Sequence, residues 1–439
     1  MKRLMLLALM MLLALPCAAE EFYTEMPALL SFTQEMHSET VAQDIFIRRT
    51  YPDTANDRID EEMRALIDDM AEKSRPVLPL ERVTIPSYLD VGANISRSGK
   101  SLLSFLTVAE VSREKKQLSV DFDARVYDTA TGERVQLSDL FEGDAAYAVL
   151  GDALRNTLEN AFPAIEADKA VIDALCAPEA IAKTPFTLGA ARLTLIVRAD
   201  AVYPGKNTLL HANVGYSALR GYMNEYGLKQ TDNSRFQMLA LTFDDGPARG
   251  VTRAVLDALR DYGASATFFV VGERFGNNHD MLCREQDANH SIQSHTYAHK
   301  YPNELAKGEA ERDRERFAAE LGEITGVAPV MMRAPGGHAS YYAKREIGYP
   351  LIQWTFAGGD SGNPHIDKIA WKVIESADDG EIALLHDLNG GSPTYTRRAL
   401  DALTKKGFLF VTVEELFEDA GSKMLDNVIY YSPTDVREK

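Results

Sequence analysis

Two carboxylates stand side by side in the stretch TFDDGP, where Asp244 and Asp245 follow the apolar run Met238 to Phe243. The apolar run predicts a buried strand, and Gly246-Pro247 directly after the pair is typical of a turn. Adjacent carboxylates at a strand end are either a solvated turn or a pair with different chemical duties. In the second case one carboxylate ligates a metal while its neighbour accepts a proton.

Two histidines, His295 and His299, lie four residues apart in SHTYAH. One helical turn would place both imidazoles on the same face. With a carboxylate from another strand end they would form a two-histidine, one-carboxylate site, which suits Zn²⁺ and keeps positions open for water and substrate. The simpler interpretation is a pair of surface or hydrogen-bonded histidines.

A third histidine, His386, follows the apolar run IALL. Imidazole titrates near neutral pH, so His386 is suited to protonate a leaving amine. The alternative is a core histidine that is hydrogen-bonded to the backbone. Together these groups supply what metal-assisted hydrolysis requires, because a bound metal lowers the pKa of water from about 15.7 to near 7 and polarises a carbonyl oxygen.

The elements that must position these residues alternate along the second half of the chain. Strands are predicted at residues 238–243, 266–272, 290–295, 329–335, 350–356 and 381–387, with amphipathic helices between them and a closing segment at 408–417. Nearly all-apolar strands that alternate with helices indicate α/β architecture with a parallel sheet, and roughly six or seven such units predict a (β/α) barrel. Active sites of such barrels lie at the C-terminal strand ends, where all of the candidate residues occur.

The first half of the chain mixes helices with short alternating strands, which predicts a smaller α+β domain. One helix is expected at residues 53–73, with Ile59, Met63, Ile67 and Met70 on its apolar face, and a second at residues 144–162. No catalytic constellation is visible in this half. Its only histidines are His37 and His211, so seven of the nine histidines lie in the second half.

The length of the chain predicts two domains, and its first residues predict a signal peptide. A chain of 439 residues exceeds the usual size of one core, so we predict domains at residues 20–232 and 233–439, joined by the polar stretch Thr231 to Arg235. Residues 1–19 are typical of a secretory signal peptide, because a basic start precedes an apolar run of about a dozen residues, short of the roughly 20 that a membrane span needs. Lipidation at Cys17 or retention as an anchor are the alternatives.

The charge and the cysteines limit the partners. The net charge is −18, and loss of Lys2 and Arg3 with the leader would make it −20, which argues against nucleic acid or anionic lipid as a partner. We expect an exported protein without a transmembrane domain after cleavage of the leader. Cys176 and Cys283 would remain, either paired or as free thiols. The sequence does not indicate the oligomeric state.

The motifs TFDDGP, ATFFVVGERF, SHTYAH, RAPGG, GGDSG and ALLHD occur in this order. In that order they resemble the polysaccharide deacetylase family, the NodB-homology group also called family-4 carbohydrate esterases. The resemblance covers roughly residues 238–420. It implies a distorted (β/α) barrel and metal-dependent removal of acetyl from N-acetylated amino sugars. Among such substrates it favours peptidoglycan, with loss of acetyl from N-acetylglucosamine or N-acetylmuramic acid.

The resemblance also implies the roles of the central residues. Asp244 is expected to act as general base, and Asp245, His295 and His299 as metal ligands. His386 is expected to act as general acid. The metal is expected to be Zn²⁺, although the same ligand set accepts Co²⁺, Ni²⁺ or Fe²⁺.

Four further residues receive supporting roles from the resemblance. Arg333 and Asp360 are expected to orient the base and the acid, and Leu384 to line the acetyl pocket. The backbone N–H of Gly336 is expected to help hold the oxyanion, since loss of one such donor typically costs about 10²–10³ in rate.

The sequence departs from the family pattern at three places. Gly336 stands where the family usually has an aromatic residue, and Ser361 where it has a tryptophan, so two rings are missing. The first aspartate of the motif around Asp360 is also absent, and Asn289 replaces a glycine. The missing rings predict a wider, more solvated pocket that tolerates a bulkier sugar such as N-acetylmuramic acid.

The first half resembles, less specifically, an accessory domain that precedes the deacetylase in some Gram-positive peptidoglycan deacetylases and occurs in lysozyme-sensing anti-sigma factors. Such a domain would bind wall glycan or position the catalytic domain, or it would be a spacer with its own core. The alternative to an enzyme is a catalytically weak glycan-binding or sensing protein.

Overall fold

The computed structural model of the protein describes residues 29–42, 44–78 and 86–437. The predicted signal peptide at residues 1–19 lies outside these ranges. Within them, no helix combines the length and the apolar character that crossing a membrane requires.

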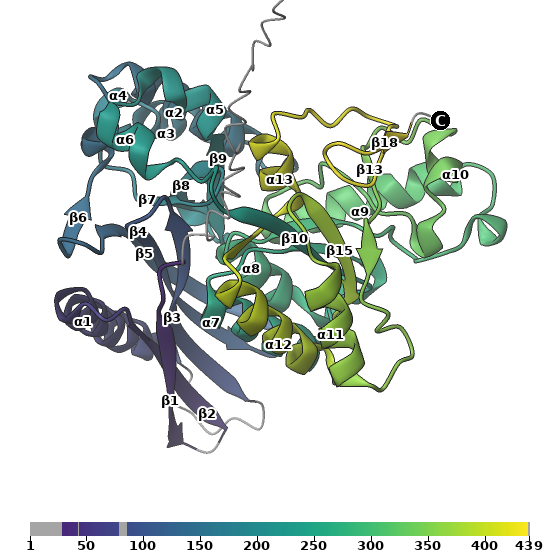
Figure 1. The fold of residues 1–439 in the computed structure, drawn as a ribbon, viewed down its shortest axis with the longest axis horizontal. Helices are drawn as coiled ribbons and strands as arrows, with labels where there is room; N and C mark the ends of the chain where they lie inside the picture. Colours follow the sequence, from purple (N-terminus) through teal and green to yellow (C-terminus); the bar gives the residue numbers. More distant parts are fainter. Residues whose placement is uncertain (1–28, 43, 79–85, 438–439) are drawn as a thin grey trace, which may run out of the picture.

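A six-stranded sheet forms the N-terminal part of the structure (Figure 1). Its strands, in both chain and spatial order, are β1 (Thr33–Ala42), β2 (Ile45–Asp53), β3 (Ser87–Ser98), β4 (Leu102–Arg113), β5 (Lys116–Asp128) and β6 (Glu133–Val135). Neighbours are antiparallel except β2 and β3, which are parallel. Parallel neighbours need a crossover, and helix α1 (Asp57–Ser74) lies between them in the chain.

Helix α1 confirms the first predicted amphipathic helix. Asn56 caps its N-terminus, because the Asn56 side chain accepts a hydrogen bond from the backbone N–H of Ile59. The apolar face packs on the sheet through four buried residues, Ile59, Met63, Ile67 and Met70.

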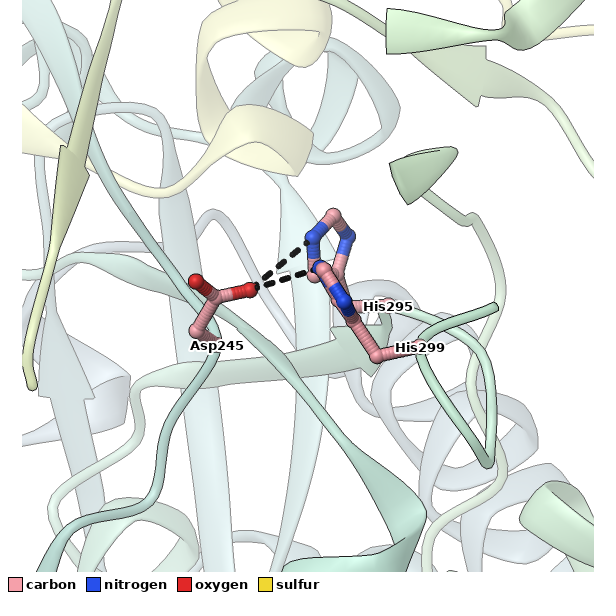
Figure 2. Close-up of side chains that lie close together, drawn as sticks. All are labelled: Asp245, His295 and His299. Atoms are coloured by element: carbon pink, nitrogen blue, oxygen red, sulfur yellow. Dashed lines mark ion pairs between the residues drawn. The ribbon is translucent and has the colours of Figure 1, made fainter. Parts of the chain in front are cut away.

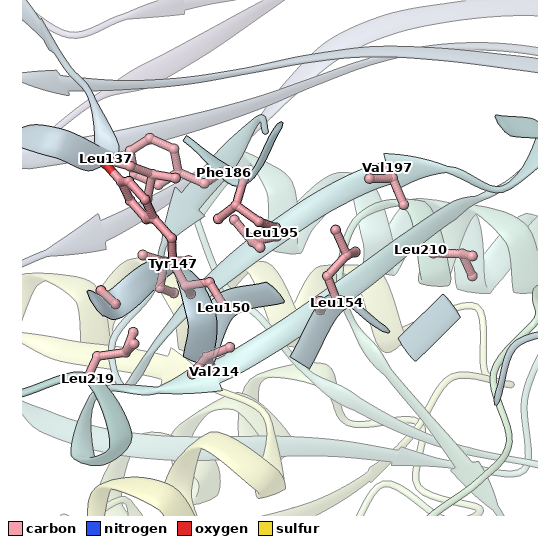
Figure 3. Packing of buried hydrophobic residues seen from close by; sticks show 14 of the residues in the cluster. Leu137, Tyr147, Leu150, Leu154, Phe186, Leu195, Val197, Leu210, Val214 and Leu219 are labelled. Atoms are coloured by element: carbon pink, nitrogen blue, oxygen red, sulfur yellow. The ribbon is translucent and has the colours of Figure 1, made fainter. Parts of the chain in front are cut away.

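A helical layer over a small sheet completes the first half. The helices are α2 (Ala145–Asn160), α3 (Lys169–Leu175), α4 (Pro178–Ile181), α5 (Tyr216–Leu219) and α6 (Glu225–Gln230). The antiparallel sheet consists of β7 (Phe186–Leu188), β8 (Arg192–Arg198) and β9 (Leu209–Gly215). Figure 3 shows Leu150 and Leu154 of α2 packed with Leu195 of β8 and Val214 of β9.

A parallel sheet forms the core of the second half, in the order β12-β11-β10-β15-β14, with β16 beside β10. The strands are β10 (Gln237–Asp244), β11 (Thr267–Val270), β12 (Ser291–Ser294), β14 (Phe356–Ala357), β15 (Glu381–His386) and β16 (Phe408–Val411). The helices are α7 (Arg249–Tyr262), α8 (His279–Asp287), α9 (Glu309–Thr325), α10 (Ala339–Ala343), α11 (Ile366–Ser376), α12 (Ser392–Lys405) and α13 (Val413–Asp419). The predicted α/β alternation is therefore confirmed.

Two predicted strands of this half are broken. The segment 329–335 pairs only through Met332, in isolated bridges to Ser294 and Leu351. The segment 350–356 divides into β13 (Leu351–Ile352), which pairs with β17 (Ile429–Tyr430), and β14, which pairs with β15. A final short strand, β18 (Val436–Arg437), pairs with β17.

The broken segment explains why the barrel is distorted. At one end of the row of paired strands, β13 is linked to β12 through Met332. At the other end, β14 pairs with β15. Residues 351–357 supply both β13 and β14, so one stretch of chain lies at both ends of the row. A continuous run of strand pairing around the ring is absent among the described residues.

The two halves contact each other through ionic and polar groups. Asp90 on β3 pairs with Arg253 of α7 and with Arg284 of α8, whose Nη2 lies 2.7 Å from Asp90 Oδ2. In the stretch predicted as a linker, Asn233 is buried, donates to the carbonyl of Ala190 and accepts from the backbone N–H of Gly99. The division at residue 233 remains a prediction, since both sides of it pack together.

The two cysteines of the described chain are unpaired. Cys176 is partly buried and Cys283 is buried, and both are free thiols. Of the two alternatives left open by the sequence, the structure has the free thiols.

Candidate active site

The carboxylate pair lies at the C-terminal end of β10. In the parallel register Asp244 is the partner of Phe269 on β11 and of His386 on β15, so the predicted base and acid are neighbours across two strands. Asp245 has a positive φ of 73°, and its backbone N–H donates to the carbonyl of Phe269. This left-handed residue ends the strand and turns the second carboxylate away from the first.

Asp245 faces the two histidines that follow β12 (Figure 2). Its Oδ1 lies 3.0 Å from Nε2 of His299 and 3.3 Å from Nε2 of His295. The three side chains come together although they are 50 to 54 residues apart in the chain, because β10, β11 and β12 are consecutive parallel strands.

A loop, rather than the expected helical turn, holds His295 and His299 together. Thr296 and His299 have positive φ angles of 65° and 50°, which no α-helix contains. The carboxylate of Asp313, on α9, accepts hydrogen bonds from the backbone N–H groups of Tyr297 and Ala298 and so fixes the loop. The prediction of proximity is confirmed, but its helical explanation is wrong.

Hydrogen bonding sets the tautomer of His295. Its Nδ1 lies 2.8 Å from the carbonyl oxygen of Arg333, and because a carbonyl only accepts, Nδ1 carries the proton. In the neutral ring Nε2 then presents a lone pair toward Asp245. This arrangement is common for a metal-ligating histidine.

The residues fit a divalent cation. Asp245 Oδ1 is buried and converges with the Nε2 atoms of two imidazoles. Burial raises the pKa of Asp245, but hydrogen bonds with His295 and His299 and their charges outweigh it and hold this pKa well below its usual value. The hydrogen bond with Asp245 raises the pKa of His299 in turn. A cation would replace the proton that the charged carboxylate otherwise favours on His299.

Arg333 holds Asp244. The Nη1 of Arg333 donates to Asp244 Oδ1 over 2.8 Å and to Thr242 Oγ1 over 2.6 Å. Its other nitrogens donate to the carbonyls of Ile352 and Gln353. The arginine is fully buried, and its four hydrogen bonds fix the position of the guanidinium. The guanidinium in turn holds the Asp244 carboxylate in one orientation.

His386 is held by Asp360. The Nδ1 of His386 donates to Asp360 Oδ1 over 3.0 Å, and the His386 backbone N–H donates to Asp360 Oδ2 over 2.8 Å. Burial lowers the pKa of His386, but the hydrogen bond with Asp360, together with the charges of Asp360, Asp244 and Asp245, raises it to about 8. The ring is therefore protonated at neutral pH and keeps Nε2–H for another acceptor.

Leu384 lies two residues before His386 on β15, and residues two apart on a strand point to the same face. Its register partner is Thr242, which contacts Arg333, so Leu384 belongs to the face of the sheet that carries the site. Its side chain is nearly buried.

Three residues that support the site were missed by the sequence reasoning. They are Asp313, which fixes the histidine loop, Tyr395, which donates to Asp360 Oδ2 over 2.6 Å, and Asp387. A Cβ on Gly246 would lie 2.7 Å from Cγ of Asp387, so the glycine after the carboxylate pair is required by this close approach. The only signal for Asp387 was its place in the ALLHD motif.

The departures from the family pattern have structural consequences. Asn289 has a positive φ of 59°, a conformation that asparagine tolerates better than most residues that could replace a glycine. Gly336 also has a positive φ, of 60°, and a Cβ there would lie 2.5 Å from Cε1 of Tyr301. The Tyr301 ring therefore lies beside position 336, and the wider pocket stays a prediction.

Comparison with known proteins identifies the class. Residues 231–350 match the family described as polysaccharide deacetylase. A peptidoglycan-N-acetylglucosamine deacetylase of Bacillus cereus is 35% identical over 193 residues, which cover 41% of this chain and 88% of that protein. The chain belongs to the polysaccharide deacetylase family.

Two further similar proteins differ in how much of their own length this chain covers. The peptidoglycan-N-acetylglucosamine deacetylase PgdA of Listeria monocytogenes is 33% identical over 45% of this chain and 42% of its own length, so the chain spans less than half of that relative. The solved structure of "T48 deacetylase with substrate" is 31% identical, with a TM-score of 0.42 over 45% of this chain and 98% of that one.

Proposed function

We propose that this protein is an exported, divalent-metal-dependent hydrolase that removes acetyl groups from the N-acetylated amino sugars of peptidoglycan. One observation carries the proposal. Asp245 Oδ1 and the Nε2 atoms of His295 and His299 converge beside Asp244, whose strand register partner is His386. Ligands, base and acid for amide hydrolysis thus occupy one end of one sheet.

Asp245, His295 and His299 would hold the metal, with Zn²⁺ as the expected ion and Co²⁺, Ni²⁺ or Fe²⁺ as alternatives. A divalent ion at this place supplies Lewis acidity, which acidifies water and polarises a carbonyl oxygen. His299 and Asp245 are partly exposed, with 32% and 24% of their side-chain surface accessible, whereas His295 is buried. The open side of the ligand set is the side from which water and substrate would arrive.

Asp244 would accept the proton of the attacking water. Its Oδ1 is occupied by Arg333, and its Oδ2 lies on the side of the metal ligands, 3.7 Å from His295 Nε2. Oδ2 is therefore the basic atom in this proposal. The hydrogen bond from Arg333 holds the Asp244 carboxylate in one orientation.

His386 would donate its Nε2 proton to the nitrogen of the acetamide as the carbon–nitrogen bond breaks. Asp360 holds the Nδ1 proton, so Nε2 is the atom left for transfer. The Gly336 backbone N–H would stabilise the oxyanion, and Leu384 would contact the acetyl methyl group. Water and the amide are consumed, and acetate and a free amine are formed.

The substrate assignment draws on the relatives. Those from Listeria monocytogenes and Bacillus cereus are peptidoglycan-N-acetylglucosamine deacetylases, and one from Bacillus subtilis, 28% identical, is a peptidoglycan-N-acetylmuramic acid deacetylase. Peptidoglycan lies outside the cell membrane, which agrees with the predicted leader at residues 1–19. In this proposal the first half of the chain binds wall glycan or positions the deacetylase half.

Acetate release tests the proposal. Purified peptidoglycan incubated with the wild type and Zn²⁺ should release acetate, and Asp245→Ala should not. Mass spectrometry of the digested wall then identifies the sugar that has lost its acetyl group. If wild type and variant were equally silent on wall, chitin oligomers and poly-N-acetylglucosamine, the chain would be a glycan-binding or sensing protein instead.

A further inference from the structure

An exposed tyrosine from the histidine loop occupies the space beside Gly336. A Cβ at Gly336 would lie 2.5 Å from Cε1 and 3.3 Å from Cδ1 of Tyr301. Contacts this close do not occur between real side chains, so position 336 cannot carry a side chain while the tyrosine ring is in place. The Tyr301 ring therefore lies in the space that a side chain at position 336 would need.

Local contacts fix the backbone at Tyr301. Tyr301 precedes Pro302 and has the extended conformation expected before proline, with φ −72° and ψ 157°. Its N–H donates to Glu304 Oε2 over 2.8 Å, and its carbonyl accepts from the Glu304 N–H over 2.9 Å. Two local hydrogen bonds and a proline therefore hold the backbone from which the ring projects.

Two imidazoles flank the ring. The Tyr301 centroid lies 6.1 Å from that of the metal-ligand candidate His299 and 5.8 Å from that of His338, both in edge-on geometry. Even so, 43% of Tyr301 remains exposed to solvent. An aromatic ring that lies beside a candidate metal ligand while much of its surface stays open is typical of a ligand-contacting wall.

We propose that Tyr301 is a specificity-determining residue that contacts the sugar ring whose acetamide is hydrolysed. This inference rests on the proposed function, since it takes an amino-sugar glycan as the ligand. The apolar C–H face of a pyranose suits an aromatic ring, and the tyrosine hydroxyl tolerates the wet edge of the site. Substrate fit at this wall would then be set by the loop of residues 300–304 and not by residues 335–337.

The proposal predicts how substitutions at the two positions differ. Gly336→Tyr should be disruptive for two reasons, the positive φ of 60° and the collision with Tyr301. Tyr301→Ala should instead leave the backbone of the site intact and remove only the wall. The informative variants are therefore at Tyr301.

The experiment measures KM and kcat on N-acetylglucosamine oligomers for the metal-loaded wild type, Tyr301→Ala, Tyr301→Phe and Tyr301→Trp. Tyr222→Ala is the matched control, because Tyr222 is exposed by 37% and lies in the first half of the chain. We expect Tyr301→Ala to raise KM about tenfold with a much smaller change in kcat, and Tyr301→Phe to restore KM. Metal content per chain should stay unchanged, which excludes an effect through His299.

Two further readouts make the outcome decisive. The ratio of activity on the oligomers to activity on 4-nitrophenyl acetate, which has no sugar, should fall about tenfold in Tyr301→Ala. Calorimetric binding of the oligomers tests the contact between Tyr301 and the sugar even if no acetate is released. Absence of acetate release would therefore contradict the proposed hydrolysis, whereas unchanged binding by Tyr301→Ala would contradict this inference. An oligomer KM and affinity within twofold of wild type in Tyr301→Ala would overturn the inference.

Discussion

Arg333 donates a hydrogen bond of 2.8 Å from Nη1 to Oδ1 of Asp244, while its own backbone carbonyl accepts from Nδ1 of His295 over 2.8 Å. One buried residue therefore orients both the candidate base and a candidate metal ligand. One contact is made by the guanidinium of Arg333 and the other by its backbone carbonyl, so a shift of Arg333 would move Asp244 and His295 together. This relationship makes the candidate base and the candidate metal site a single structural unit.

Asp244→Asn should remove the proposed general base without changing metal binding. The amide can still accept from Arg333 but cannot take a proton, so kcat should fall by about 10²–10⁴. Bound metal per chain, measured by elemental analysis, should remain at the wild-type level because Asp244 is not in the ligand set. Loss of metal in this variant would mean that the two aspartates have the opposite roles.

Asp245→Asn should lose the metal. Removal of the one charged ligand should reduce divalent-metal affinity by at least about tenfold, as loss even of outer supporting groups does at such sites. Isothermal calorimetry with Zn²⁺ measures this, and a chelator should abolish acetate release by the wild type. Asp401→Asn, at an exposed carboxylate on α12 that pairs with Lys405, is the matched control and should bind metal as the wild type does.

The alkaline limb of the pH–rate profile should report His386. The acid must be protonated, its pKa is raised to about 8, and activity should therefore be retained below that pH and fall as pH rises through it. Asp360→Asn removes the charge that raises this pKa, so the limb should move by about 1 pH unit or more toward acid.

Tyr395→Phe is the control for that shift. It removes a hydroxyl that donates to Asp360 Oδ2 but keeps the carboxylate charge, so its alkaline limb should stay close to that of the wild type. An unchanged limb in Asp360→Asn would show that another group titrates there.

Gly246→Ala should disturb the site through packing. The added methyl group would meet the buried carboxylate of Asp387, and overpacking of this kind typically costs about 1–3 kcal/mol. Because the loop carries Asp245, kcat and metal affinity should fall together. Gly276→Ala, which places its methyl group in open space, should change neither property nor the urea midpoint. Equal behaviour of the two variants would contradict the close approach.

Arg284→Met should weaken the joint between the two halves. Arg284 Nη2 lies 2.7 Å from Asp90 Oδ2 and 2.8 Å from Glu110 Oε2, all three side chains being largely buried. Removal of the cation leaves the buried carboxylate of Glu110 without its ion-pair partner, whereas Asp90 keeps Arg48 and Arg253. Loss of one partner of a buried pair typically costs about 3–5 kcal/mol in the free energy of unfolding. Arg398→Met breaks an exposed pair with Asp367 and should cost less than about 1 kcal/mol in the same urea titration.

Much of the fold followed from local patterns. The period of Ile59, Met63, Ile67 and Met70 predicted α1, and the apolar runs predicted β10 and β15, because hydrophobic periodicity is a property of a short window. The segments 329–335 and 350–356 were predicted as regular strands and are broken. Their pairing depends on partners from distant parts of the chain, which no local window contains.

The candidate site divides in the same way. Residue types and spacing alone indicated hydrolytic metal chemistry for Asp244, Asp245, His295, His299 and His386. The helical turn expected at residues 295–299 is instead a loop with two positive φ angles. Loop conformation of this kind is set by tertiary hydrogen bonds, here those that Asp313 accepts from the loop N–H groups, and spacing along the chain does not encode it.

By itself, the sequence determined the set of chemical groups, their order along alternating strands and helices, and the family to which the chain belongs. Only the tertiary structure decided which atoms face one another. Asp245 Oδ1 meets two imidazole nitrogens, Arg333 holds Asp244, and the ring of Tyr301 lies against Gly336. Those contacts join residues separated by about 35 to 90 positions, and strand register and loop path bring them together only when the whole sheet has formed.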